Sequence, residues 1–173
     1  VPSTLQWEQR GVTIEQDGEF PQSSSTTFTV KTTQKQHFAL NLLIPSWAEK
    51  ASISINGKKT SVKVTGKARY HTISRKWKDS DKVQLHLQGG FKIHHLQGDC
   101  QTIAISYGPM LLAFIENDKI ELQLTEHQLL NNLQATDASK GIFTLNHNGK
   151  QYTLRPLFDV DDETYSVYVQ LKP

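Results

Sequence analysis

Cys100 is the residue whose type suggests nucleophilic chemistry most directly, because it is the only thiol in the chain. A thiol becomes an effective nucleophile beside a base, a metal or a helix N-terminus. Cys100 stands between Asp99 and an expected strand, and His94 and His95 are near it only in sequence. We interpret it as a structural thiol, of the kind that usually packs as a small buried hydrophobe, and predict no catalytic residue in this chain.

Two groups of side chains offer donors that could bind a metal ion. His86, His94 and His95 form the only histidine cluster, but adjacent residues of a strand point to opposite faces, so His94 and His95 would not meet at one ion without a bulge. The acidic turn at 159–163 carries oxygen donors that suit calcium, yet it lacks the spaced glycine of a calcium loop. We therefore predict a solvated loop there, and neither a metal nor another cofactor in this chain.

Trp7, Trp47 and Trp77 are the candidate binding residues, because sugar rings stack on flat aromatic faces. Trp47 follows Pro45 at the end of an expected strand, and Trp77 follows another strand between two lysines. These positions suit residues that cap a core or dock onto a neighbouring domain, and we favour that interpretation over stacking on a glycan.

The composition excludes several classes of function. Lys+Arg 19 against Asp+Glu 17 gives a net charge of +2 with no basic stripe, so we expect no nucleic-acid partner. No segment approaches ~18 continuous apolar residues, and we expect no membrane span. Residues 1–4 lack the charged and apolar regions of a signal peptide. One cysteine fits a cytoplasmic, periplasmic or secreted protein equally well.

Short runs of alternating apolar and polar residues, separated by turn residues, dominate the chain and predict half-buried antiparallel strands. The longest run covers residues 38–44. Asn56-Gly57 and Asn148-Gly149 tolerate the positive φ angles of a tight hairpin. The continuously apolar stretch 110–115 suggests a strand buried on both sides.

Only the segment 125–133 has a helical pattern, with Thr125 as a cap and Leu129, Leu130 and Leu133 on one face. Roughly a dozen short strands and one short helix predict an all-β fold, an antiparallel β-sandwich or jelly roll. The region from 117 onwards begins with the weakest strand character. We therefore divide the chain into a β-sandwich at 1–116 and residues 117–173, which either complete that sandwich or form a small appended β subdomain.

Motifs in five parts of the chain occur in a recognisable order. They are Leu42-Leu43-Ile44-Pro45-Ser46-Trp47-Ala48, the hairpin Ile55-Asn56-Gly57-Lys58, the spaced set Tyr70, Ile73, Arg75, Trp77 and Asp81, the strand Tyr107-Gly108-Pro109-Met110-Leu111-Leu112-Ala113, and Leu154-Arg155-Pro156-Leu157-Phe158 with Tyr165-Ser166-Val167-Tyr168. This series resembles the β-sandwich region that follows the catalytic domain in glycoside hydrolase family 127, whose type member is a β-L-arabinofuranosidase. The chain departs from the family pattern at Leu43, where the family has arginine, and at Ser80, where it has glycine.

The N-terminal segment Val1–Trp7 is similar to the segment that leaves the family's catalytic (α/α)6 barrel. The resemblance implies that this chain begins inside a motif and that residues 1–116 follow a barrel that is missing here. It also implies that the cysteine nucleophile, and a zinc ion with its cysteine and glutamate ligands, belong to that barrel. None of those positions exists in this sequence.

These observations predict a non-catalytic C-terminal β-sandwich of a glycoside hydrolase acting on L-arabinofuranosyl or related sugars, with the catalytic domain of the same protein as its partner. A docking face left uncovered would drive dimerisation. One alternative is an autonomous carbohydrate-binding module, which predicts two exposed tryptophans close together and measurable affinity for a glycan. A bare interaction domain predicts a defined oligomer without glycan binding.

Overall fold

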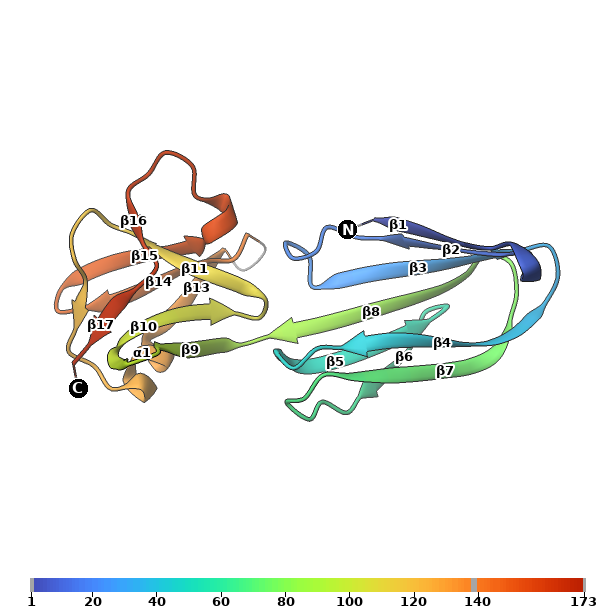
Figure 1. The fold of residues 1–173 in the computed structure, drawn as a ribbon, viewed down its shortest axis with the longest axis horizontal. Helices are drawn as coiled ribbons and strands as arrows, with labels where there is room; N and C mark the ends of the chain where they lie inside the picture. The colour runs from blue at the N-terminus through green and yellow to red at the C-terminus, as the bar shows by residue number, and fades with distance from the viewer. Residues whose placement is uncertain (1, 138–139, 173) are drawn as a thin grey trace. The chain divides into compact units, whose positions relative to one another are not determined.

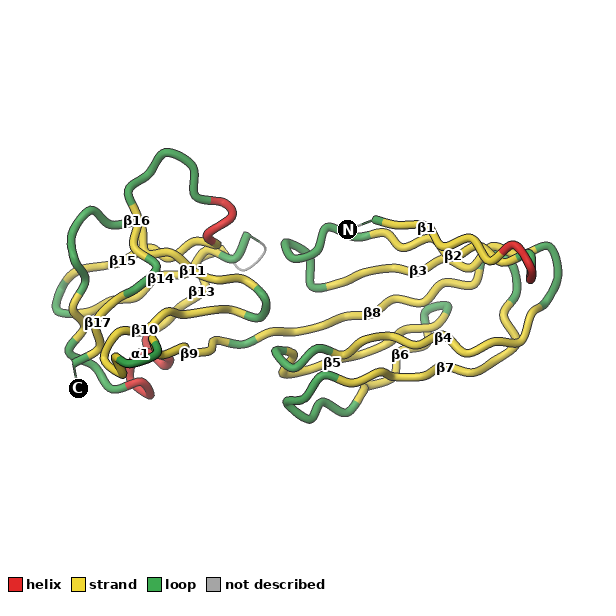
Figure 2. Tube along the Cα trace, in the orientation of Figure 1, coloured by secondary structure: helices red, strands yellow, loops and turns green. Residues whose placement is uncertain are grey.

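The computed structural model describes residues 2–137 and 140–172 of the chain, which consist mainly of β-strands (Figures 1 and 2). Val1, the first residue of the N-terminal motif, lies outside the described residues, as does Pro173. The chain forms two compact units, unit 1 at 1–89 and unit 2 at 90–173. The predicted all-β fold with one short helix is confirmed, with more strands than expected.

Unit 1 is an antiparallel two-layer structure. Its strands are β1 (Ser3–Trp7), β2 (Val12–Asp17), β3 (Ser25–Thr32), β4 (Gln36–Ile44), β5 (Ala48–Ile55), β6 (Lys58–Val62), β7 (Arg69–Trp77) and β8 (Asp81–Gly89). Six of them form a sheet in the order β1-β2-β3-β8-β5-β6, whereas β4 and β7 pair with each other alone.

The two layers of unit 1 enclose one hydrophobic core. Phe38 and Leu42 of β4 and Trp77 of β7 pack with Val30 and Val83 of the six-stranded sheet. Successive side chains of a strand alternate between faces, so every second residue of these strands enters the core. The alternation at 38–44 therefore predicted the inner face of β4 correctly at Phe38, Leu42 and Ile44.

Unit 2 is built on a second, branched sheet. Its strands are β9 (Phe91–Leu96), β10 (Asp99–Tyr107), β11 (Met110–Ile115), β12 (Glu121–Leu122), β13 (Leu133–Asp137), β14 (Ile142–His147), β15 (Lys150–Pro156), β16 (Tyr165–Ser166) and β17 (Val169–Leu171). The main path is β12-β17-β10-β11-β15-β14-β13, with β9 paired to β10 and β16 paired to β11. The pairs are antiparallel except β12 with β17.

The division between the units differs from the expected one at 116 and 117. Strands β10 and β11 hydrogen-bond to β17 and β15, respectively. Residues 90–116 therefore belong to the same sheet as the end of the chain, and the boundary falls between Gly89 and Gly90.

Both predicted Asn-Gly hairpins are confirmed. The first joins β5 to β6 and the second joins β14 to β15. Asn56 and Gly57 have φ angles of 49° and 86°, and Asn148 and Gly149 have 49° and 75°. Positive φ at both central residues gives the turn a twist that matches its strands.

The predicted helix is α1 (Glu126–Asn132), with Thr125 as its cap. The Thr125 hydroxyl accepts a hydrogen bond from the Gln128 amide nitrogen, and the Gln128 side chain accepts one from the Thr125 amide nitrogen at 2.9 Å. This reciprocal capping satisfies two backbone donors that would otherwise lack partners. Leu129 and Leu133 are buried in the core of unit 2. Within the described residues no helix has the length and apolar character needed to cross a membrane.

Candidate functional site

Trp77 lies in the core of unit 1, which corrects its place among the candidate binding residues. It is fully buried, and its Nε1 donates a hydrogen bond to the Phe38 carbonyl oxygen at 3.0 Å. The Phe38 ring stacks on it, with 5.5 Å between centroids. Ile73, Arg75 and Trp77 alternate onto the inner face of β7, so the flanking lysines point outwards while the indole is enclosed. Trp77 is available neither to a sugar nor to a docking partner.

Trp7 and Trp47 reach the surface of unit 1 in different settings. Trp7 contacts Phe38 edge-on, and the Arg10 guanidinium lies over its ring at 4.7 Å from the centroid. One face of the Trp7 ring is therefore already covered. Trp47 is half-buried in the turn between β4 and β5, and it stacks against Phe20 at 5.9 Å.

Trp47 lines an apolar groove of about 540 Å³ in unit 1. Side chains from the six-stranded sheet and from the β4–β7 pair form it together. We call this feature the apolar groove and define it by its floor and its rim: Ile14, Phe28, Leu42 and Leu85 at the floor, and Leu5, Phe20, Leu43, Trp47 and Tyr70 at the rim.

The rim of the apolar groove exposes large apolar side chains. Leu5, Leu43 and Tyr70 have exposed fractions of 59%, 47% and 68%. Leu43 and Tyr70 are register partners on the outer side of the β4–β7 pair. Contiguous apolar surface of this kind is unusual unless another molecule or domain covers it. Among the described lining residues there is no carboxylate, imidazole, thiol or amine, so the groove is suited to apolar contact and not to acid–base chemistry.

The rim was only partly foreseeable from the sequence. Leu42 and Leu43 are consecutive apolar residues in an alternating strand, so one of them had to face outwards. That signal marks Leu43, where the family pattern has arginine. Leu5, Phe20 and Tyr70 carry no comparable signal, because they come from separate segments that only the fold brings together.

The arginine–tryptophan–aspartate motif forms a buried polar turn beside the core. Asp81 is 1% exposed and accepts hydrogen bonds from Asn56 Nδ2 at 2.8 Å and from the Lys78 amide nitrogen at 3.1 Å. Arg75 lies 3.6 Å from Oδ2, the same carboxylate oxygen that accepts from the Lys78 amide. Burial acts to raise the pKa of Asp81, but Asn56, the Lys78 amide and Arg75 together outweigh it and hold the pKa below its ordinary value. The residues of this turn are therefore structural.

Ser80 adopts the conformation that explains the glycine of the family pattern at this position. Its φ angle is 62°, in the left-handed region that favours glycine. The turn nevertheless forms, because the Ser80 amide nitrogen donates to the Val30 carbonyl oxygen at 2.9 Å.

Cys100 is exposed, contrary to the expectation that it packs as a small buried hydrophobe. The neighbouring His95 imidazole is engaged on both sides: Nδ1 bonds the Cys100 carbonyl oxygen at 2.9 Å, and Nε2 bonds Glu126 at 3.1 Å. Neither nitrogen is left to activate the thiol. The His94 imidazole is hydrogen-bonded to the Ser106 hydroxyl instead, because adjacent residues of β9 point to opposite faces.

Arg155 organises the acidic turn that could have held calcium. It forms ion pairs with Glu163 and Asp159 and also bonds the Asp159 carbonyl oxygen at 2.6 Å. A guanidinium therefore occupies the position that a cation would need. Across residues 2–137 and 140–172, no group of three or more histidine, cysteine, aspartate or glutamate side chains is arranged to hold a metal.

Comparisons with known proteins agree with this architecture. A family model described as "Beta-L-arabinofuranosidase, GH127 middle domain" matches residues 1–89. No curated protein matches the chain.

Solved structures match nearly the whole chain, and three of them illustrate the likeness. A glycoside hydrolase matches with a TM-score of 0.70 and 16% identity, covering 99% of this chain and 34% of its own. A GH127 β-L-arabinofuranosidase from Geobacillus stearothermophilus T6 matches with a TM-score of 0.63 and 18% identity, covering 99% and 32%. A GH127 β-arabinofuranosidase matches with a TM-score of 0.64 and 18% identity, covering 98% and 33%. These likenesses establish the fold, and the chain spans about a third of the length of each structure.

Proposed function

This chain belongs to the glycoside hydrolase 127 family of β-L-arabinofuranosidases, and from that premise we propose that it is a non-catalytic accessory region of such a hydrolase. In this proposal the two β units support a catalytic domain that acts on L-arabinofuranosyl or related sugars. The family model over residues 1–89 is the observation that carries the proposal, because its description as a middle domain supports a place for unit 1 inside a larger enzyme.

The chemistry of the chain supports a non-catalytic role. Glycoside hydrolysis needs two groups on either side of the scissile bond, one to protonate the leaving oxygen and one to attack or to activate water. The apolar groove offers neither. The buried carboxylate of Asp81 is held by Asn56 and Arg75, and the His95 imidazole beside Cys100 is engaged at both nitrogens.

We propose the apolar groove as the surface onto which the catalytic domain docks. About two thirds of the length of the solved relatives lies outside the part that this chain matches. Ser3 and Leu5 of β1 line the groove, so a polypeptide joined to the start of β1 would emerge at its edge. An apolar partner that covers Leu5, Leu43 and Tyr70 would remove their apolar surface from water. This burial would stabilise the complex by about 25 cal/mol for each Å² covered.

An activity assay tests the non-catalytic role. The chain incubated with aryl L-arabinofuranosides should release no more aryl alcohol than buffer does. Turnover that Cys100→Ala abolishes would overturn the proposal, because it would place the nucleophile in this chain.

The gene sequence upstream of Val1 tests the position of the chain in a larger enzyme. A long helical region that carries a glutamate and paired cysteines near its end would support the proposal. A start codon directly before Val1 would contradict it.

A binding assay with the separately produced upstream region tests the docking surface. Leu43→Asp places a charge in the rim and should weaken the complex at least tenfold, or roughly 1.4 kcal/mol, because a carboxylate would have to be desolvated in an apolar interface. Phe158→Asp is the matched control, since Phe158 is an exposed apolar residue outside the groove. Equal affinities of the two variants would exclude the groove as the docking surface.

Two measurements on the isolated chain test the alternative functions. Self-association that Leu43→Asp removes, measured by light scattering, would show that the uncovered groove drives dimerisation. Retention of the chain in an arabinan gel, lost on Trp47→Ala, would favour an autonomous carbohydrate-binding module instead.

A further inference from the structure

The six-stranded sheet of unit 1 has a second face, opposite the core, on which polar side chains form rows across four strands. Residues in register on neighbouring strands lie on the same face. Thr27 of β3, Gln84 of β8, Ser54 of β5 and Lys59 of β6 form one such row. Beside it, His86 lies between Ser25 and Ser52 in the next row.

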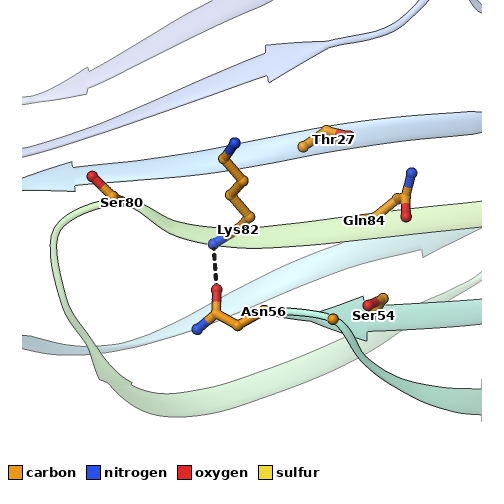
Figure 3. A pocket seen from close by; sticks show the side chains of 7 residues that line it. Thr27, Ser54, Asn56, Ser80, Lys82 and Gln84 are labelled. Carbon is orange, nitrogen blue, oxygen red and sulfur yellow. Dashed lines mark hydrogen bonds between the residues drawn. The ribbon is translucent and has the colours of Figure 1, made fainter.

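Short and long side chains alternate along these rows and leave two adjoining hollows. Their volumes are about 380 Å³ and about 260 Å³, and Ser54 and Gln84 line both. Figure 3 shows the first hollow, with Gln84 on β8 between Thr27 and Ser54 on the neighbouring strands. We call the pair of hollows the polar trough and define it by the residues that carry the argument: Thr27, Ser52, Ser54, Lys59, Lys82 and Gln84.

The six side chains that define the trough make no hydrogen bond or ion pair to a described residue, whereas Asn56, Ser80 and His86, which also line the hollows, are hydrogen-bonded. The Ser52 residue is only 8% exposed, yet its hydroxyl makes no hydrogen bond to any described residue. The Ser52 oxygen is not among the fully buried unpaired atoms of the described residues, so it is accessible to water or to a ligand. Lys59 and Lys82 likewise form no ion pair with a described residue. On the same sheet face, by contrast, Lys31 is paired with Glu15 at 2.5 Å.

The charge of the trough favours an anion. Its lining includes Lys59 and Lys82 and no carboxylate. The carboxylate behind it, Asp81, already bonds Asn56 and lies 3.6 Å from Arg75, so its charge is largely balanced from the core side. The Asn56 side chain is fixed in turn, because its oxygen accepts from the Lys82 amide nitrogen at 2.8 Å (Figure 3).

The remaining groups of the trough suit a polyhydroxylated ligand. Hydroxyls and a carboxamide both donate and accept hydrogen bonds, as sugar hydroxyls require. No phenylalanine, tyrosine or tryptophan lines either hollow, so recognition would not depend on stacking against these rings. We propose that the polar trough binds a sugar that carries an anionic group, either a carboxylate or a phosphate. This site is separate from the apolar groove, and its existence does not depend on the docking proposal.

Calorimetric titration of the 173-residue chain with four probes tests this inference. The probes are a short oligogalacturonate, galactose 1-phosphate, a neutral galactose oligomer and inorganic phosphate. We expect at least one of the two anionic sugars to bind, and the tighter one identifies the anionic group. The neutral oligomer should bind about tenfold more weakly or not at all, since it cannot form charge-assisted hydrogen bonds. Raising the ionic strength should weaken binding of the anionic sugar.

Three variants locate the site. The double variant Lys59→Gln and Lys82→Gln should weaken binding of the anionic sugar by about tenfold or more. The matched control is Lys35→Gln with Lys76→Gln, which removes the same charge from exposed lysines of unit 1 outside the trough. Ser54→Leu fills the floor that both hollows share and should abolish binding with every charge retained. Tryptophan fluorescence checks that each variant is folded. We expect all three to fold, because their substitutions lie on the polar outer surface of unit 1.

Four results would overturn the inference. They are failure of both anionic sugars to bind, equal binding of the neutral oligomer, displacement of the sugar by an equal concentration of inorganic phosphate, and equal losses in the two double-lysine variants. Each would leave the docking proposal unaffected, since the binding assay with Leu43→Asp tests a different surface.

Discussion

Replacing Asp81 by asparagine is the most informative perturbation of unit 1, because this carboxylate connects three parts of the chain. It accepts hydrogen bonds from Asn56, in the β5–β6 turn, and from the Lys78 amide, in the β7–β8 turn. It also lies 3.6 Å from Arg75 of β7. Asparagine keeps the shape of the side chain and removes its charge.

The expected cost follows from these contacts. Asparagine offers one oxygen, so it can accept from Asn56 or from Lys78, and its amide group then faces the other donor. A hydrogen bond to a charged group contributes about 1.5–3 kcal/mol. The ion pair with Arg75 adds less, because the Arg75 side chain is 37% exposed and solvent screens it. We therefore expect Asp81→Asn to lower the free energy of unfolding of unit 1 by roughly 2–3 kcal/mol.

Denaturant unfolding followed by tryptophan fluorescence measures this change. The chain has three tryptophans, at 7, 47 and 77, and all lie in unit 1, so the signal reports the unfolding of that unit. Asp79→Asn is the control for burial, since Asp79 lies in the same turn and also accepts hydrogen bonds, from the Thr32 amide nitrogen and the Ser80 hydroxyl, but is exposed to solvent, which weakens them. We expect a clearly smaller change in the control.

The pH dependence provides a second readout. The folded-state pKa of Asp81 is lowered, so the ionised carboxylate stabilises unit 1. This contribution to the free energy of unfolding is fully present above the ordinary pKa of 3.8 and is lost as the pH falls from there through the folded-state pKa. The stability difference between the wild type and Asp81→Asn should therefore be constant near neutral pH and should shrink below about pH 4. The buried-carboxylate argument would be refuted if Asp81→Asn cost no more stability than the Asp79→Asn control. It would also be refuted if the cost of Asp81→Asn persisted unchanged in strong acid.

Two further substitutions test local features of the fold. Ser80→Gly should stabilise unit 1 by about 0.5–1 kcal/mol, because glycine adopts the φ of 62° without strain; an unchanged or lower denaturation midpoint would contradict this. Thr125→Ala should destabilise the start of α1 by about 1 kcal/mol through loss of the capping box. Amide hydrogen exchange should then accelerate in α1 and leave unit 1 unaffected, whereas equal acceleration in both units would show that the cap is not a local feature.

Local patterns in the sequence predicted the elements that short segments determine by themselves. The two Asn-Gly hairpins and the capped helix after Thr125 each depend on a few adjacent residues. The position of Trp77 was predicted less well, because Arg75 interrupts the apolar alternation between Ile73 and Trp77 and hides their common face. Arg75 can occupy that inner face because Asp81, from the next strand, balances its charge.

Features that depend on distant segments were not predictable in this way. The pairing of β10 with β17 joins residues 102–103 to 169–170 and places the unit boundary at Gly89. Local alternation identified these segments as strands and contained no information about their partners. The apolar groove and the polar trough have the same origin, since each takes its lining from several strands that are separate in the sequence.

The strand order of each sheet has a consequence for the order of folding during synthesis. In unit 1, β8 lies between β3 and β5, so the meander β1–β3 and the hairpin β5–β6 have no hydrogen-bonded link until β8 arrives. The sheet becomes continuous only when residues 81–89 have left the ribosome. Unit 2 repeats this arrangement, because β17 lies between β12 and β10. In both units the strand synthesised last is inserted between two earlier ones. Until β8 arrives, the edges of β3 and β5 are open to pairing with other chains, and until β17 arrives, the same holds for the edges of β10 and β12.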